Sequence, residues 1–193
     1  MSSNRKNNVV LVIPVFSDHP SKNELISITK TVQILQNRIL RILHPECLDI
    51  SAFKSVVPTR INSENTIEFV SFPAIHFAGI RMYNTWFLTS GFYENFINFE
   101  FLCFIQTHAF LFSDDLDHWL DQYWDYIGAP WFEGWDKGDY EKIISAGNGG
   151  FSLRRINPII HVLNSKKKLY GHKQSIIKLM KKNRGRSLYL TGI

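Results

Sequence analysis

Two short runs of almost unbroken apolar residues dominate the hydrophobic pattern of the chain, at residues 9–16 and 99–106. The first run is rich in β-branched residues and stops at the polar pair Ser17 and Asp18. Runs of this length and composition are typical of strands that are buried on both faces of a parallel sheet. Pro14 has no N–H to donate, so we expect the first strand to end close to it.

The segments around these two runs predict further strands and helices in alternation. Strands are expected at residues 38–43, 66–72 and 123–127, and helices at residues 22–36, 49–55 and, as one or two short helices, within 77–96. We expect Ser113 to cap another short helix, with Asp114, Asp115 and Asp117 in its first turn. We expect Asn157 to cap a helix that has Pro158 at its first position, and a basic helix to follow at about residues 172–182. This alternation predicts an α/β fold with a mainly parallel central sheet flanked by helices and a basic helical C-terminal tail.

The composition predicts a sizeable hydrophobic core, and the charges are distributed unevenly along the chain. Of the 193 residues, 45% are apolar and 20% are charged, which is enough for a sizeable core. Residues 154–193 carry 11 of the 22 Lys and Arg residues and none of the 17 acids, whereas nine acids lie between Asp114 and Glu141. This separation predicts a cation or polar ligand near the acids and an anionic partner near the basic tail. Two solvated surfaces are the alternative.

The cysteines and the hydropathy limit the class of protein. Cys47 and Cys103 lie far apart and form no CxxC motif, which argues against a disulfide scaffold and a cysteine-based zinc site. No apolar run approaches the roughly 20 residues that a helix needs to span a bilayer. Residues 1–8 lack the apolar stretch of a signal peptide. We therefore expect a soluble protein in the reducing environment of the cytoplasm.

Gln106, Thr107 and His108 directly follow the second buried strand. In open α/β sheets, ligands bind beyond the carboxyl ends of the strands, so these residues are candidates for a binding site. His108 could ligate a divalent metal or contact a phosphate, or it could be purely structural. Asp114 and Asp115 could bind a hard cation, although helix capping alone explains their position.

A glycine-dense segment, residues 147–150, leads into the apolar residues 151–153. Its glycines would let the backbone approach a ligand closely, with Asn148 supplying an amide; a tight turn or a bulge is the alternative. The chain has no GxxxxGK[ST] motif and no GxGxxG motif after the first strand, so ordinary P-loop and Rossmann sites lose support. No motif of a metalloprotease, an α/β-hydrolase or a papain-like protease occurs either, and no spacing singles out a carboxylate pair for glycoside hydrolysis.

Two strings carry a resemblance to a known family: DYIGAPW at residues 125–131 and GNGGFSLR at residues 147–154. Smaller pieces occur in the same order, namely VIPV at 12–15, HPE at 44–46, LDI at 48–50, YN at 83–84, GFY at 91–93 with Phe96, and QTxAF at 106–110. Over about residues 9–155 the chain resembles a glycosyltransferase-like family of bacterial and eukaryotic proteins, catalogued mainly as a domain of unknown function.

The resemblance implies a GT-A-like nucleotide-sugar fold for residues 1–155, with residues 156–193 as a basic helical tail that packs on it or extends from it. In such folds the first strand and its loop hold the nucleotide, and a short acidic motif at the end of a central strand holds a divalent metal on the diphosphate. Carried over by position, the donor site would comprise Pro14, Val15, Phe16, Ser17, Gln106 and Thr107. Asn148, Gly149 and Gly150 would face the sugar or the acceptor, and Trp131 would stack on a sugar face.

The chain departs from the family's pattern in two places. His108 stands where the pattern usually has Asp, which makes His108 the implied ligand of Mn²⁺ or Mg²⁺. Neutral imidazole binds Mn²⁺-type ions but is a poor ligand for Mg²⁺, so a metal-independent or weakened enzyme is the alternative. Relatives also continue to a further acidic motif, whereas no Asp or Glu follows Glu141 here. We therefore expect a C-terminally truncated member, or one whose base lies elsewhere, and we assign no catalytic base.

Three functions follow from these observations. The first is a glycosyltransferase that moves a sugar from a nucleotide-sugar donor to a glycan or lipid-linked acceptor, with the basic tail against an anionic membrane surface. The second is a catalytically degenerate module that binds a sugar or a nucleotide. Nucleic-acid binding through residues 166–186 is disfavoured, because that segment offers charge without a recognised nucleic-acid-binding motif.

Overall fold

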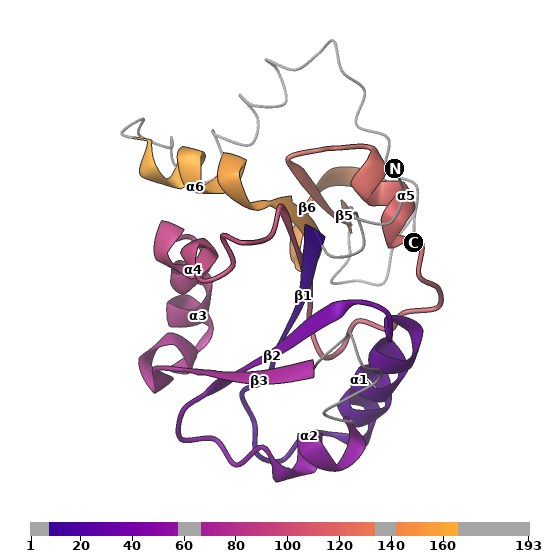
Figure 1. Cartoon of the computed structure of the whole chain (residues 1–193), viewed down its shortest axis with the longest axis vertical. Helices are drawn as coiled ribbons and strands as arrows, with labels where there is room; N and C mark the ends of the chain where they lie inside the picture. Colours follow the sequence, from indigo (N-terminus) through magenta and orange to yellow (C-terminus); the bar gives the residue numbers. More distant parts are fainter. Residues whose placement is uncertain (1–7, 58–66, 134–141, 166–193) are drawn as a thin grey trace.

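The computed structural model describes residues 8–57, 67–133 and 142–165, which form one mixed sheet with helices on both faces (Figure 1). The six strands are β1 (Val9–Pro14), β2 (Ile39–Pro45), β3 (Ile67–Phe72), β4 (Phe101–Ile105), β5 (Tyr126–Phe132) and β6 (Ile143–Arg155). Their order across the sheet is β3-β2-β1-β4-β6-β5. The first four strands of this order are parallel, whereas β6 is antiparallel to both β4 and β5. The predicted α/β class with a mainly parallel sheet is confirmed.

The chain reverses its direction of travel across the sheet between β1 and β4. From β1 it adds β2 and β3 on one side, and it then returns to place β4 on the other side of β1. Crossover connections between parallel strands are right-handed, so connections that lead in opposite directions place their helices on opposite faces. The strand order therefore reverses at the carboxyl ends of β1 and β4, which is the place where ligands bind in open α/β sheets.

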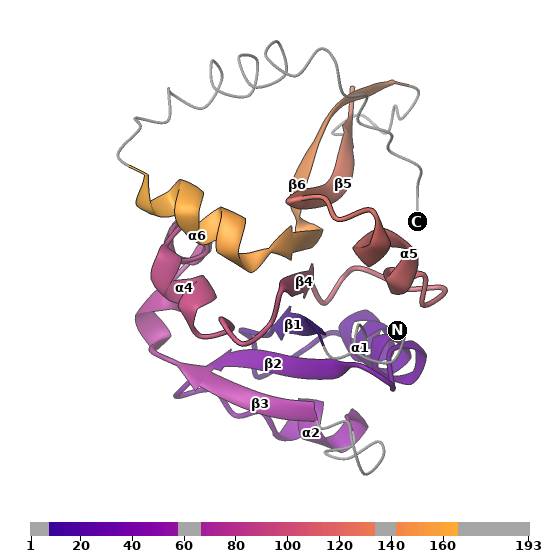
Figure 2. The same cartoon turned by 45° about the horizontal axis from the view of Figure 1, so that its top comes forward.

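Helices from different parts of the chain cover the two faces (Figures 1 and 2). One face carries α1 (Lys22–Ile34), α2 (Ser51–Val56) and α5 (Leu116–Asp121). The other carries a 3₁₀ turn (Ala74–Phe77), α3 (Ile80–Trp86), α4 (Ser90–Glu94) and α6 (Ile156–Asn164). Alternate residues of β1 point into the two cores: Leu11 and Ile13 into the α1 side, Val10 and Val12 into the α3 side. This is the two-sided burial that the apolar pattern of residues 9–16 predicts.

The core beside α3 and α4 consists largely of aromatic rings. The Phe87 ring packs edge-on against Tyr83, Phe92 and Phe104, with ring centroids 4.5–4.7 Å apart. Edge-to-face pairs at this distance add about 0.5–1.5 kcal/mol each beyond the area that they bury. The cluster holds Tyr83 and Tyr93 in place and directs them toward the strands, so it positions two polar groups of the candidate site.

Two predicted helix caps and the placement of the glycine-dense segment are wrong in detail. Ser113 does not cap α5; Asp115 occupies that position and makes no side-chain capping bond, and Ser113 Oγ donates to Asp115 Oδ2 at 2.7 Å. The helix near Asn157 begins two residues earlier than expected, at Ile156 and with Arg155 as its cap, because the chain enters α6 directly from β6. The glycine-dense segment does not precede a strand but lies inside β6, where bulges between β5 and β6 absorb its irregular register.

The segment after β6 contributes one helix to the described fold. The apolar residues Ile156, Ile159, Ile160 and Leu163 of α6 pack into the aromatic core beside α4. The remainder of the predicted basic tail, including the helix expected at residues 172–182, lies outside the described residues. Over residues 8–57, 67–133 and 142–165, every helix is too short or too polar to traverse a lipid bilayer.

Candidate functional site

The carboxyl edge of β1 and β4 gathers most of the residues expected at a ligand site. Val12 of β1 pairs with Phe104 of β4, so the segments that begin at Pro14 and Gln106 leave the sheet side by side. Gly150 of β6 joins them, because the Gln106 N–H donates to the Gly150 carbonyl at 2.8 Å. The tertiary structure thus brings the strand end and the glycine segment together, although they lie more than 40 residues apart in sequence.

Gly150 leaves room for the side chain of Gln106. A Cβ at Gly150 would overlap Gln106 Oε1 and lie 2.8 Å from its Cδ. Asn148 Oδ1 accepts a 2.9 Å bond from the Gly150 N–H, so the Asn148 side chain also holds this segment. The backbone of Gly150 and the amide of Gln106 therefore form one polar surface at the end of β4.

The turn after β4 is anchored to the first turn of α1. The Ala109 N–H donates to the Gln106 carbonyl at 2.9 Å, and Thr107 Oγ1 donates to Glu24 Oε1 at 2.8 Å. Glu24 also closes the capping box of α1, since its Oε2 accepts from the Ser21 N–H at 2.9 Å. Burial raises the pKa of Glu24, but the hydrogen bonds from Ser21 and Thr107, with the nearby His108, outweigh it and lower that pKa. Glu24 is thus an ionised anchor that no local sequence pattern connects to Thr107.

His108 is exposed, and the described residues around it do not form a metal site. Glu24 is close enough for its charge to interact with His108, but both Glu24 carboxylate oxygens already accept hydrogen bonds. Within the described ranges, no three side chains of His, Cys, Asp or Glu gather to hold a metal ion. The donor set around His108 therefore does not fit a divalent metal, and the predicted metal ligand is left without companions among these residues.

At the end of β1, the side chains on the surface are those of Phe16 and Ser17. Pro14 and Val15 lie in the core, where the Val15 N–H donates to the Leu43 carbonyl at 2.8 Å. The Phe16 ring is 57% exposed and packs edge-on against Tyr83, with centroids 6.1 Å apart. The Tyr83 hydroxyl is directed toward the Gln106 amide, but it meets no partner in hydrogen-bonding geometry among the described residues. Burial raises the pKa of Tyr83, so its hydroxyl stays protonated.

Strand β5 and the first half of β6 form a two-stranded ribbon (Figure 2), and β5 carries Trp131. It is paired with Ser145, three residues before Asn148 along β6, and its side chain is 36% exposed. The structure thus places Trp131 on the same two strands as the glycine segment, beyond the end of β4.

Sequence reasoning missed Arg154, which is the most buried charged group near the site. It is 8% exposed on β6, with its guanidinium over the rings of Phe104 and Tyr126 at 5.1 and 5.8 Å. Three hydrogen bonds hold it: Nε donates to Ser152 Oγ at 3.0 Å, Nη1 to the Tyr93 hydroxyl oxygen at 2.7 Å and Nη2 to the Gly149 carbonyl at 3.1 Å. The signal in the sequence was an arginine at a core-facing position of a strand, two residues after Ser152.

The acids before α5 serve a buried arginine. Arg38 is 1% exposed, and it donates to Asp114 through Nε at 3.1 Å and Nη2 at 3.0 Å, and to Asp117 through Nη1 at 2.8 Å. Burial lowers the pKa of Arg38, but the hydrogen bonds and charges of the two carboxylates outweigh this effect and raise that pKa overall. The group therefore stays a cation. The expectation that Asp114 binds a hard cation is replaced by this ion pair.

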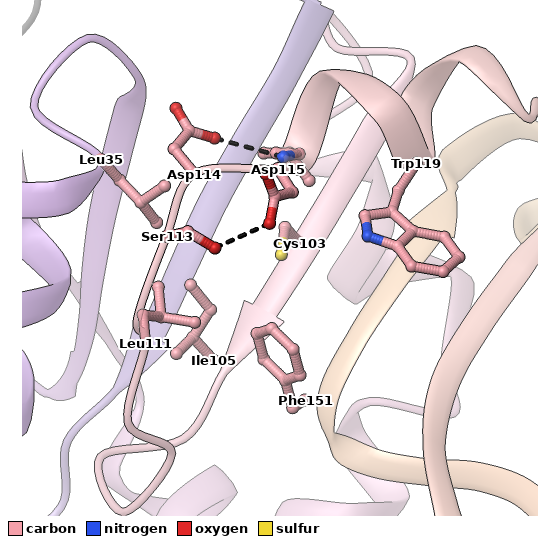
Figure 3. A pocket seen from close by; sticks show the side chains of 10 residues that line it. Leu35, Cys103, Ile105, Leu111, Ser113, Asp114, Asp115, Trp119 and Phe151 are labelled. Atoms are coloured by element: carbon pink, nitrogen blue, oxygen red, sulfur yellow. Dashed lines mark hydrogen bonds between the residues drawn. The ribbon is translucent and has the colours of Figure 1, made fainter. Parts of the chain in front are cut away.

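A cavity of about 40 Å³ lies between β4 and the segment that leads into α5 (Figure 3). Its walls are mostly apolar, with Leu35, Ile105, Leu111, Trp119 and Phe151 around the sulfur of Cys103 and with Ser113 and Asp115 at its margin (Figure 3). Burial raises the pKa of Cys103 to about 12, so its thiol is unreactive. The cavity has room for a few water molecules and is too small for a nucleotide.

A larger hollow of about 360 Å³ lies at the opposite, amino edge of β1 and β4. Its polar groups bond to one another: Asn8 Nδ2 donates to Glu100 Oε2 at 2.7 Å, and the Tyr123 hydroxyl donates to Glu100 Oε1. Arg155 lies over the Tyr123 ring at 3.8 Å and pairs with Asp125 at 2.8 Å. We interpret this network as one that stabilises the segment before β5 and does not bind a ligand, because open α/β sheets bind ligands at the carboxyl edge.

One solved structure shares the fold of this chain, and two others align with it more weakly. Core-mannan synthase A from Aspergillus fumigatus, in its Mn/GDP form, aligns with a TM-score of 0.51 at 6% identity, over 85% of this chain and 65% of that chain. The mannosyltransferase Ktr4p from S. cerevisiae aligns with a TM-score of 0.42 at 12% identity, and its GDP complex with 0.41 at 11%. The chain spans 40% and 41% of the length of those two structures, and each alignment covers 66% of this chain. The expected GT-A-like fold is confirmed.

Sequence comparisons support the predicted family. No curated protein matches the sequence. The model of one family, described as "Protein of unknown function (DUF5672)", matches residues 66–186. This match includes the DYIGAPW and GNGGFSLR strings and covers more than half of the chain, which therefore belongs to the DUF5672 family.

Proposed function

We propose that this chain binds a nucleotide sugar at the carboxyl edge of β1 and β4 and acts as a glycosyltransferase. The observation that carries the proposal is the convergence of Gln106, Thr107 and Gly150 at the point where the strand order reverses. Ligands in open α/β sheets bind at this point because the loops there diverge and leave a crevice. The GT-A-like fold supports a nucleotide sugar as the ligand.

The donor and acceptor would occupy different parts of this edge. The nucleotide would lie against Phe16, Ser17 and the turn at Gln106, where an exposed ring and backbone polar groups are available. The sugar would lie toward Asn148, Gly149 and Gly150, and Trp131 would offer an aromatic face to a sugar of the donor or acceptor. A glycan or a lipid-linked acceptor would approach along the β5–β6 ribbon. Transfer would move the glycosyl group from the diphosphate to an acceptor hydroxyl.

A binding module without catalysis is the second candidate. The observation that favours it is that Glu24, the carboxylate bonded to the turn after β4, is held by Ser21 and Thr107 as a structural anchor. A general base needs a carboxylate oxygen that can accept the proton of the acceptor. If the chain is such a module, the end of β4 and the glycine segment bind the nucleotide or sugar, and no glycosyl transfer takes place.

Calorimetry against a panel of nucleoside diphosphates tests binding, with Mn²⁺ and with a chelator in parallel because one structure of similar fold is a Mn/GDP form. We expect the nucleoside diphosphate of one particular nucleobase to bind with a Kd below about 1 mM. Absence of heat with every diphosphate at that concentration, in both conditions, would contradict the proposed function. The metal arm also tests whether His108 takes part in a metal site.

Hydrolysis of nucleotide sugars separates the two candidates. Glycosyltransferases usually release some sugar to water when no acceptor is present, so we expect slow, enzyme-dependent release of nucleoside diphosphate from one donor of the panel. Tight binding of that donor without release, and without transfer to glycan or lipid-linked acceptors, would favour the binding module. Denatured protein at the same concentration is the control.

A further inference from the structure

We infer that Arg154 supplies the positive charge that binds the phosphate groups of the nucleotide ligand. The inference rests on the proposed function, because it assigns a residue to the diphosphate of that ligand. It starts from an unusual feature of Arg154, which is a buried cation without a carboxylate partner in the described part of the chain.

The other buried or half-buried arginines of the described ranges show what a structural arginine looks like in this fold. Arg38 pairs with Asp114 and Asp117, Arg41 with Glu68, and Arg155 with Glu100 and Asp125. Arg154 is more buried than Arg41 or Arg155, yet its three partners are two neutral hydroxyl oxygens and one carbonyl. A buried charge without an opposite charge is costly, so its presence indicates that an anion joins it in another state of the protein.

The position of the guanidinium agrees with an anion at the candidate site. Nη2 bonds to the Gly149 carbonyl, next to Gly150 and Gln106 at the end of β4. A guanidinium has five N–H donors, and the three bonds above leave donors for a phosphate. Arg binds phosphate through two parallel hydrogen bonds, which are stronger than bonds between neutral groups.

Gly149 leaves the approach to Nη2 open. Gly149 is half-exposed, and a Cβ there would lie 3.1 Å from Arg154 Nη2 and meet no other atom within 4 Å. A Cβ at Gly149 would thus press on the Arg154 guanidinium and on no other non-neighbouring group of the described structure. This gives the second glycine of the segment a role that differs from that of Gly150, which makes room for Gln106.

A second buried group on the same face also lacks a partner. The Tyr83 hydroxyl is protonated and buried, it faces the Gln106 amide without meeting it in hydrogen-bonding geometry, and the charge of Arg154 acts on it. A buried hydroxyl without a partner indicates a ligand or a water molecule in the working protein. Tyr83 would donate to the same anionic group as Arg154.

The test compares binding of a nucleoside diphosphate, inorganic pyrophosphate and the corresponding nucleoside to the full chain and to Arg154→Gln. We expect Arg154→Gln to weaken diphosphate and pyrophosphate binding by about 10- to 100-fold, since hydrogen bonds to charged groups are worth that factor, and to leave nucleoside binding unchanged. Arg154→Lys should lose less, because it keeps the charge. A purely structural arginine would change melting temperature and leave the ratio of diphosphate to nucleoside affinity as it is.

Gly149→Ala keeps the arginine and tests the approach to it. The added methyl group should weaken pyrophosphate binding at least several-fold, whereas the matched control Gly91→Ala, on α4 with open space around it, should not. The unmodified chain provides a readout that no variant can spoil: pyrophosphate should raise its melting temperature. No such rise, or normal diphosphate binding by folded Arg154→Gln, would overturn the inference. If the unmodified chain binds diphosphate and Arg154→Gln binds it equally well, the proposed function stands and the inference about Arg154 fails.

Discussion

At the scale of single residues, the site depends on what is missing at Gly150. The Gln106 side chain fills the volume that any Cβ at Gly150 would need, and Asn148 Oδ1 lies 3.3 Å from that point. Gly150 does not have a positive φ, so the requirement for glycine here comes from packing and not from backbone strain. The Gln106 side chain, which must move when Gly150 is substituted, is itself a candidate ligand-binding group.

Gly150→Ala should therefore impair binding more than folding. We expect it to displace the Gln106 amide and weaken nucleoside diphosphate binding by about 10-fold or more, the value of one or two hydrogen bonds, while the free energy of unfolding changes by less than about 1 kcal/mol. Calorimetry and urea unfolding measure the two effects. In a Gln106→Ala background the effect of Gly150→Ala on binding should largely disappear, because the clash is then gone. Equal losses in both backgrounds would contradict this account.

At the scale of elements, Arg38 connects the start of β2 with the segment before α5. Asp114 receives two of its three bonds and also accepts from the Leu116 N–H at 3.3 Å, so it holds both Arg38 and the first turn of α5. The side chain of Asp114 is 26% exposed, whereas that of Asp117 is 51% exposed. Asp114 is thus the less solvated partner of a fully buried charge.

Asp114→Asn should destabilise the fold more than the neighbouring change Asp115→Asn. Loss of the charge beside buried Arg38 is expected to cost about 1–3 kcal/mol in urea unfolding. Asp115 is exposed and bonds to Ser113, so Asp115→Asn should stay within about 0.5 kcal/mol of the unmodified protein. Equal effects of the two substitutions would show that the pair with Arg38 contributes nothing in particular to stability.

Glu24 connects α1 to the turn at Thr107, and its contribution to stability should depend on pH. Because the pKa of Glu24 is lowered in the folded state, the ionised carboxylate stabilises the fold above its ordinary pKa, and this contribution is lost as the pH falls through the lowered value. Glu24→Gln should lose about 1 kcal/mol or less at pH 7, since the group is partly exposed. The difference should vanish once the pH lies below the lowered pKa of Glu24, where both side chains are neutral. The exposed Glu46→Gln is the control, and a difference that persists at low pH would contradict the proposed role of the charge.

At the scale of the whole molecule, the chain separates its charges by position. The nine basic residues between Lys166 and Arg186 have no acid among them, and the family match extends through this segment. Helix α6, which precedes it, packs by its apolar residues into the aromatic core beside α4. A truncation after Ser165 would therefore keep every described residue and remove nine of the 22 Lys and Arg residues.

We expect the full chain to sediment with anionic lipid vesicles and not with neutral ones. Each cation near an anionic bilayer contributes roughly 1 kcal/mol at low salt, and salt of about 0.5 M should abolish the attraction. The chain that ends at Ser165 should not sediment with either type of vesicle. Equal binding to neutral vesicles, or unchanged binding after the truncation, would contradict the proposal, and tighter binding to duplex DNA would favour a nucleic-acid partner.

The sequence by itself determined the fold class and most of the strands. The apolar runs around Val12 and Phe104 mark strands buried on both faces, because local hydrophobic pattern responds directly to burial. The same pattern misplaced β5, expected at residues 123–127 and found at Tyr126–Phe132, since an edge strand that is partly exposed has a weaker signal. The resemblance of the DYIGAPW and GNGGFSLR strings predicted a family of unknown function, and the model of such a family matches residues 66–186.

Only the tertiary structure decided which residues meet. Asp114 accepts from Arg38, Thr107 donates to Glu24, and Gly150 packs against Gln106. Each of these contacts joins segments more than 40 residues apart in sequence. Sequence patterns report the burial of a residue, but the identity of a partner depends on strand order and register, which the whole chain sets. For the same reason Arg154 passed unnoticed in the sequence: its burial without an opposite charge is a property of the neighbours that the sheet brings to it.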